Sequence, residues 1–243
     1  MKAALSILFW IITAVMTILV FLSVFLLTIF LFPFDKKRKL AHAQGFWWAD
    51  AIIGVNPFWD LSLRGLEHIN PQETYVVVAN HQSLADIAML YKLRMQFKWV
   101  AKDSLFQIPI FGWCMSMMKY IKLSRGEHGS IRKTYQEASE WLRQGVSVLF
   151  FPEGTRSPTG EINSFKNGAF KLAIREKKPI LPVRIEGTRN IIPKGSWIFK
   201  TKTSCQITVL PEIDTRSYSP EEFDILKEKT RKILLAGSES GCL

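Results

Sequence analysis

The run Asn80-His81-Gln82-Ser83-Leu84-Ala85-Asp86 follows an apolar stretch and holds an imidazole and a carboxylate five residues apart. On one continuous helix this spacing would separate the two side chains by about 140°, so they can meet only if His81 lies in a loop and Asp86 in the first turn of the next helix. A carboxylate beside one ring nitrogen would fix the tautomer and leave the other nitrogen able to accept a proton. Alternatively, Asp86 forms a capping box with Ser83, and His81 is an ordinary loop residue.

A second polar run, Phe151-Pro152-Glu153-Gly154-Thr155-Arg156-Ser157, also follows an apolar stretch. The Arg156 guanidinium, the Thr155 hydroxyl and the backbone N–H groups around Gly154 could form a cradle for a phosphate. A turn that merely leaves a sheet is the alternative. The sequence contains neither a G-x-x-x-x-G-K-S/T run nor a G-x-G-x-x-G run, which argues against a nucleotide-binding loop.

Together the two runs resemble the first and third signature blocks of the glycerolipid acyltransferases, and they are most similar to those of the 1-acylglycerol-3-phosphate (lysophosphatidic acid) acyltransferases of bacterial membranes. The blocks stand in the family's order, about 70 residues apart, and the resemblance covers roughly residues 61 to 215. It implies transfer of an acyl chain from an acyl thioester, on coenzyme A or acyl carrier protein, to the free hydroxyl of 1-acylglycerol-3-phosphate, giving phosphatidic acid. The alternatives are an acyltransferase for glycerol-3-phosphate or another lysolipid, and a catalytically silent membrane-anchored lipid-binding protein.

The resemblance also implies roles for individual residues. His81 would be the general base and Asp86 the group that orients it, with backbone N–H groups beyond Asn80 as candidates for an oxyanion hole. The substrate-binding residues would be Glu153, Gly154, Thr155, Arg156, Arg125 and Lys102. Of these, Arg156, Arg125 and Lys102 would hold the acceptor phosphate. Glu153 would orient Arg156 or, alternatively, hydrogen-bond to glycerol or to the backbone. No cofactor and no metal are expected, because the thioester is a co-substrate.

Two further family blocks have partial matches. Residues 121–125 match the second block, which includes Arg125, although Lys119 stands where the family has glycine. The run Ile180-Leu181-Pro182-Val183 matches the fourth block, and we expect it to line the acyl pocket. His42, His68 and His128 are isolated, which predicts surface or interface positions.

Short β-rich runs alternate with helical patterns after residue 60. We expect strands at 75–79, 97–101, 120–123, 146–151, 180–185 and 205–210, and helices at 84–93, 130–142, 168–176 and 221–235. This alternation predicts an α/β domain with a central mixed, mostly parallel sheet flanked by helices. Loops at the ends of such strands are common places for a functional site.

The first 60 residues contain the most apolar stretch of the chain. The 32 residues from Ala3 to Phe34 carry no charge, and as a straight helix they would extend about 48 Å, against about 30 Å for the hydrocarbon core of a bilayer. Pro33 ends this helix, a basic cluster follows at 36–39, and residues 40–60 are rich in aromatic side chains typical of a membrane interface. A cleaved signal peptide is disfavoured because its apolar region would be much shorter.

Two arrangements of this membrane-embedded helical pair are open. Either the first helix crosses the bilayer, or the pair dips into one leaflet and returns. A polar stripe formed by Ser6, Thr13, Thr17 and Thr28 predicts that the first helix packs against a neighbour. We therefore expect residues 1–60 to be a membrane-anchoring two-helix segment, 61–236 the acyltransferase catalytic domain, and 237–243 a frayed tail.

Charge and cysteine content agree with this organisation. The 32 Lys and Arg residues exceed the 21 Asp and Glu residues, a net charge of +11, of which +9 falls in residues 61–243. Because no nucleic-acid-binding motif occurs, the expected anionic partners are membrane phospholipid and lysophosphatidic acid rather than nucleic acid. Three widely spaced cysteines fit a reducing compartment. We expect the cell inner membrane, with the catalytic domain on the cytoplasmic face.

Overall fold

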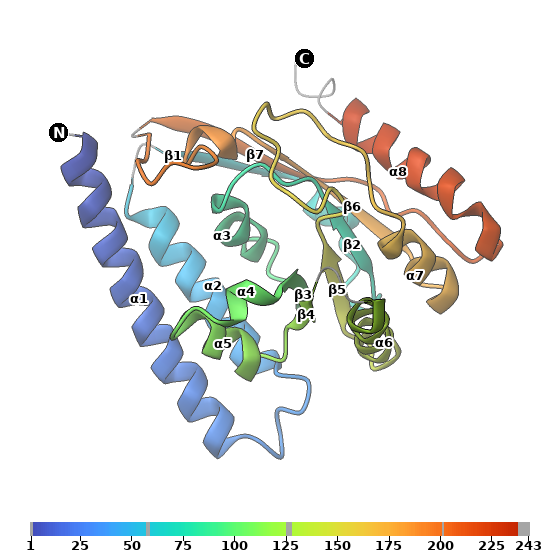
Figure 1. Ribbon diagram of the computed structural model, residues 1–243, viewed down its shortest axis with the longest axis horizontal. Coiled ribbons are helices and arrows are strands. Elements are labelled where there is room, and N and C mark those ends of the chain that lie inside the picture. The colour runs from blue at the N-terminus through green and yellow to red at the C-terminus, as the bar shows by residue number, and fades with distance from the viewer. Residues whose placement is uncertain (1, 57–58, 125–127, 201, 238–243) are drawn as a thin grey trace.

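The computed structural model describes residues 2–56, 59–124, 128–200 and 202–237. In this part of the chain the strands are β1 (Trp59–Arg64), β2 (Val76–Ala79), β3 (Phe97–Lys102), β4 (Ile121–Leu123), β5 (Ser147–Phe150), β6 (Ile180–Glu186) and β7 (Thr203–Val209). They form one sheet in the order β1-β7-β6-β2-β5-β3-β4 (Figure 1). Every neighbouring pair is parallel except β6 and β7. The predicted mixed, mostly parallel sheet is therefore confirmed.

Strands β2 and β5 lie side by side at the centre of the sheet, and all of their residues are buried. Burial on both faces explains their continuous apolar sequence, because each face packs on a helical layer. Val78 of β2 is level with Phe150 of β5. The loops that follow these two parallel strands therefore emerge together at the carboxyl edge of the sheet, which is what brings the two polar runs to one place.

The described helices are α1 (Lys2–Phe30), α2 (Lys39–Gly54), α3 (Ala85–Tyr91), α4 (Asp103–Phe106), α5 (Phe111–Met117), α6 (His128–Arg143), α7 (Gly168–Glu176) and α8 (Phe223–Ala236). Helices α1 to α5 cover one face of the sheet and α6 to α8 the other (Figure 1). Side chains alternate between the two cores along β2, where Val77 faces the first layer and Val76 and Val78 face the second.

A tight connection reverses the chain between α1 and α2. Helix α1 ends at Phe30, three residues before Pro33, as the sequence predicts. The Asp35 carboxylate accepts hydrogen bonds from the backbone N–H groups of residues 39 (2.6 Å), 40 (3.1 Å) and 41 (3.2 Å), so it satisfies the otherwise unpaired start of α2. The predicted helical pair is therefore present, with α2 ending at Gly54 rather than near residue 60.

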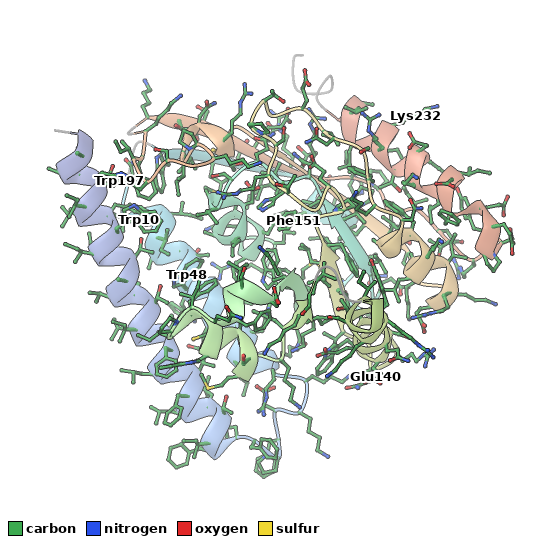
Figure 2. The ribbon with its side chains drawn as sticks, in the orientation of Figure 1. Trp10, Trp48, Glu140, Phe151, Trp197 and Lys232 are labelled. Carbon is green, nitrogen blue, oxygen red and sulfur yellow. The ribbon has the colours of Figure 1, made fainter. Side chains whose placement is uncertain are left out.

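Helix α1 packs along the domain instead of standing apart from it. Near its start, the Ser6 hydroxyl accepts from the Phe199 N–H (3.0 Å) and the Trp10 indole donates to the Trp197 carbonyl (2.8 Å), two residues seen together in Figure 2. Farther along, Trp48 of α2 donates to the Thr17 hydroxyl (3.0 Å). The predicted polar stripe thus does meet a neighbour at Ser6 and Thr17.

The boundary predicted at residue 60 falls inside a strand. Residues Trp59–Arg64 form β1, which pairs in parallel with β7. Phe9 and Val24 of α1 belong to the same buried cluster as sheet residues such as Val77. The two N-terminal helices and the sheet therefore share one hydrophobic core. Strand β1 and the short helices α4 and α5 have no counterpart among the predicted elements.

Candidate active site

The His81 and Asp86 side chains meet at the carboxyl end of β2. His81 Nδ1 lies 2.7 Å from Asp86 Oδ2, and Asp86 is fully buried. The pairing needs the arrangement that the spacing predicts, with His81 in the loop after β2 and Asp86 in the first turn of α3. The same Oδ2 accepts from the backbone N–H groups of Gln82 (2.7 Å) and Ser83 (3.0 Å), so Asp86 holds both the imidazole and the loop that leads into α3.

This contact fixes which nitrogen of the His81 ring carries the proton. Nδ1 donates its proton to the carboxylate, so the lone pair of the neutral imidazole lies on Nε2. The ring stacks on Phe151, with centroids 4.0 Å apart and planes 15° apart, and its side chain is 16% exposed. Asp86 and Phe151 thereby hold the His81 ring, which also lines a cavity described below. A fixed, partly exposed imidazole with a buried carboxylate behind it is suited to act as a general base.

Glu153 joins the two polar loops. Its Oε1 accepts from the His81 N–H (2.9 Å), and its Oε2 accepts from the backbone N–H (3.0 Å) and side-chain amide (2.9 Å) of Asn163. In return, the Ser157 N–H donates to the His81 carbonyl (2.8 Å). The expectation that Glu153 orients Arg156 is therefore wrong: both carboxylate oxygens hold other groups, and Glu153 aligns the loop that carries His81.

The same contacts correct the expected oxyanion hole. The backbone N–H groups of His81, Gln82 and Ser83 all donate to the carboxylates of Glu153 or Asp86. These three donors stabilise the loop and are not directed at a substrate oxygen.

Asn80 fastens the start of this loop to the neighbouring strand. Its side-chain amide donates to the Ile185 carbonyl (2.8 Å) and accepts from the Ile185 N–H (2.7 Å) on β6. Asn80 and Ile185 are both buried. A side chain at position 80 that paired with only one of the two Ile185 backbone groups would therefore leave the other without a hydrogen bond, which is costly.

A cavity of about 1010 Å³ opens beside His81. Its lining includes residues of both polar loops and three cations, Lys102, Arg156 and Lys166, together with Glu153, Gly154 and Thr155. Five of the six predicted substrate-binding residues therefore line one cavity. Arg125 lies outside the described residues. Lys166 was not predicted. Its backbone N–H donates to the Pro152 carbonyl (2.8 Å), which ties it to the second polar loop. In the sequence, only its place shortly after the second polar run could have indicated it.

The rest of the cavity is apolar and reaches the helical pair. Val20 of α1 and Gly45 and Trp48 of α2 line it, together with Leu84, Trp99 and Met115. The run Ile180-Leu181-Pro182-Val183 does form β6, but none of its four residues lines this cavity, because the strand is buried within the sheet. That expectation was wrong.

A buried polar network supports the cavity wall. The Tyr91 and Tyr120 hydroxyls lie 2.6 Å apart, Trp99 Nε1 donates to Tyr91 (3.2 Å), and His42 Nδ1 lies 2.9 Å from the Tyr120 hydroxyl. Burial, with a smaller contribution from the Lys98 charge, lowers the pKa of His42 to about 3, so this imidazole is neutral. His42 is thus an internal link between α2 and the sheet rather than a surface residue.

The backbone conformation at Lys119 explains why the family block has glycine at this position. Its φ of 54° lies in the left-handed region that favours glycine, in the turn between α5 and β4. The turn is therefore kept with a lysine, at a cost in backbone strain.

The acyltransferase family model matches residues 60–186. The chain is 41% identical over 169 residues to the chloroplastic 1-acyl-sn-glycerol-3-phosphate acyltransferase LPAT1 of Arabidopsis thaliana, covering 69% of this chain and 47% of that protein. It is 28% identical to the 1-acyl-sn-glycerol-3-phosphate acyltransferase of Pseudomonas aeruginosa, covering 75% and 69%. The chain spans about half the length of the plant relatives it matches.

The fold has a close counterpart among solved structures. The crystal structure of the 1-acyl-sn-glycerophosphate acyltransferase PlsC from Thermotoga maritima superposes with a TM-score of 0.73 at 28% identity. The superposition covers 97% of this chain and 98% of that one, so it includes the helical pair as well as the sheet.

Proposed function

Because the chain belongs to the acyltransferase family, we propose that it transfers an acyl chain from an acyl thioester to the free hydroxyl of 1-acylglycerol-3-phosphate, giving phosphatidic acid. The observation that carries the proposal is the His81–Asp86 pair, 2.7 Å apart, with His81 in the wall of a cavity that is lined by both cationic and apolar side chains. An anionic acceptor and an apolar acyl chain need these two environments to meet at the reacting atoms.

In the proposed reaction, Nε2 of His81 takes the proton from the glycerol hydroxyl as its oxygen attacks the thioester carbonyl. The tetrahedral intermediate then collapses, forming the ester and breaking the C–S bond. The thiolate that leaves takes the proton back from the imidazolium. The substrate's own hydroxyl is the nucleophile, so no acyl-enzyme forms and no cofactor takes part.

Asp86 supports this cycle because its carboxylate lies beside the ring while the imidazolium exists. It is fully buried, so water screens its attraction for the ring only weakly. The hydrogen bond to Nδ1 also prevents the ring from flipping to the tautomer that would place the proton on Nε2.

Lys102, Arg156 and Lys166 are proposed to hold the acceptor phosphate, with Arg125 as a further contact. Each charge-assisted hydrogen bond to a phosphate contributes about 1.5 to 3 kcal/mol. Their main effect would be to fix the glycerol hydroxyl close to His81. The apolar walls from α1, α2, α3 and β3 would then take an acyl chain.

The helical pair is proposed to lie in one leaflet, with the site at the surface of the membrane. Ser6 and Phe9 contact the domain near one end of α1 and Val24 is buried near the other, a separation of about 27 Å along the helix axis. A helix that crossed the bilayer would leave the domain over that distance. The opposite face of α1 is exposed and apolar, and Phe30 and Phe34 at its end are 71% and 86% exposed.

The basic cluster at 36–39 favours the cytoplasmic leaflet, which carries the anionic lipids. We therefore propose a cytoplasmic-face location, on the inner membrane of the cell. The relative from Arabidopsis thaliana is named as chloroplastic.

The experiment that tests the function is a comparison of acceptors and donors with the purified protein in vesicles. Lysophosphatidic acid, glycerol-3-phosphate and a lysophosphatidylcholine are each supplied with acyl-CoA or acyl carrier protein thioester, and the products are identified by mass spectrometry. Phosphatidic acid from lysophosphatidic acid is the expected product. Product from another acceptor alone would reassign the substrate, and lipid binding without loss of thioester would point to a silent binding protein.

A further inference from the structure

The segment 191–200, which we call the bridging segment, connects three parts of the molecule that are distant in sequence. The Ile192 carbonyl accepts from the Ser83 hydroxyl in the His81 loop (2.9 Å). Farther along the bridging segment, the Trp197 carbonyl accepts from the Trp10 indole of α1, and the Phe199 N–H donates to the Ser6 hydroxyl of α1. Between these attachments, Lys194 reaches the second polar loop.

Lys194 makes two contacts there. Its Nζ donates to the Arg156 carbonyl (3.1 Å) and to the Thr155 hydroxyl (3.3 Å). Both residues line the cavity, whereas Lys194 does not. The ammonium therefore acts on the backbone that carries Arg156.

The local fold directs this lysine. The Ser196 N–H donates to the Pro193 carbonyl (3.0 Å), closing a turn in which Lys194 is the second residue and Gly195 the third, with a φ of +83°. Ile191 and Phe199 are buried on either side of the turn, so its base is fixed in the core.

We infer that Lys194 is a positioning residue for acceptor binding: it holds the Thr155–Arg156 backbone so that the Arg156 guanidinium faces the acceptor phosphate. The inference rests on the proposed function and extends it to a residue in none of the sequence blocks. The His81 loop keeps its own supports, from Asp86, Glu153 and Asn80, and these do not involve Lys194. Loss of the lysine should therefore weaken acceptor binding and leave the chemical step intact.

The test compares Lys194→Met with Lys194→Arg and with the matched control Lys200→Met. Lys200 belongs to the same segment and also carries an exposed ammonium, but that ammonium contacts only Asn190 Oδ1 (3.4 Å) among the described residues. Steady-state kinetics are measured with lysophosphatidic acid at saturating acyl thioester. We expect Lys194→Met to raise KM for the acceptor about tenfold with kcat within about twofold. Lys194→Arg should restore most of the loss, and Lys200→Met should match the wild type.

A double-mutant cycle tests whether Lys194 acts through Arg156. If it does, adding Lys194→Met to Arg156→Met should raise KM by less than about twofold more. Full additivity, an unchanged KM in Lys194→Met, or an equal effect of Lys200→Met would each overturn the inference.

A binding measurement separates this inference from the proposed function. In the His81→Ala background, where turnover is blocked, lysophosphatidic acid binding is followed by tryptophan fluorescence with and without Lys194→Met. If the wild type makes no phosphatidic acid but the variant still binds about tenfold more weakly, the function fails and the inference stands. If turnover is present and neither KM nor Kd shifts, the inference fails and the function stands.

Discussion

Replacing Asp86 by asparagine removes one negative charge from behind His81 while keeping the side-chain shape. In the transition state the imidazolium would lie next to Oδ2, at the position where Nδ1 is now 2.7 Å away. With charge centres about 4 Å apart and an effective dielectric constant of about 20, the lost attraction is about 4 kcal/mol. That corresponds to a decrease in kcat of about a thousandfold.

The fold should survive this change, because the asparagine oxygen can still accept from the Gln82 and Ser83 N–H groups. Some loss of stability is expected: Oδ1 of Asp86 is buried without a hydrogen-bond partner among the described residues, and an amide N–H₂ placed there would be unsatisfied. The Tm of the variant is therefore measured first, and activity is assayed well below that temperature.

The assay is thiol release from an acyl thioester with lysophosphatidic acid, at saturating concentrations of both. Asp103→Asn is the matched control, because Asp103 is an acidic residue in the first turn of α4 whose carboxylate accepts only from the Ser104 N–H among the described residues. We expect it to keep wild-type kcat. A folded Asp86→Asn protein with kcat within tenfold of the wild type would refute the role assigned to this carboxylate.

Three further predictions follow from the geometry. Arg156→Met should raise KM for lysophosphatidic acid about 10- to 100-fold, with a smaller effect on an acceptor that lacks the phosphate; equal effects on both acceptors would exclude a phosphate contact. Gly45→Ala should lower the free energy of unfolding by about 1 to 3 kcal/mol, because its Cβ would overlap the Tyr91 ring, whereas Gly54→Ala, with nothing near its Cβ, should be neutral or stabilising in chemical denaturation. Burial, helped by the Lys119 charge, lowers the pKa of Lys98 from 10.5 to about 7. The unfolded chain therefore binds a proton between these values that the folded protein does not. The free energy of unfolding should then rise more steeply from pH 7 to 9 in the wild type than in Lys98→Met, and parallel profiles would contradict this shift.

Much of the sheet could be predicted from the sequence because its central strands are buried on both faces and so read as continuous apolar runs. The His81–Asp86 pairing was also accessible, since the five-residue spacing allows contact only across a loop-to-helix junction. The alternative, a capping box with Ser83, is met only in part: Asp86 accepts from the Ser83 N–H, but the Ser83 hydroxyl accepts from the Ala85 N–H and, among the described residues, α3 has no side-chain cap.

What the sequence did not indicate depends on contacts between distant segments. Glu153 lies 72 residues from His81, and no local pattern distinguishes a carboxylate that binds a phosphate-holding arginine from one that binds a backbone N–H. Strand β1 was missed because its pairing partner, β7, lies about 140 residues later. Helices α4 and α5, of four and seven residues, are too short to show a helical period.

Helix α1 and helix α2 form the wall of the cavity on one side and an apolar outer surface on the other. Deleting them to obtain a water-soluble version would therefore remove part of the cavity wall together with the proposed attachment to lipid. If the helical pair lies in the bilayer as proposed, substitutions in it that lengthen or shorten the cavity also change the surface that meets lipid, so the two properties are coupled.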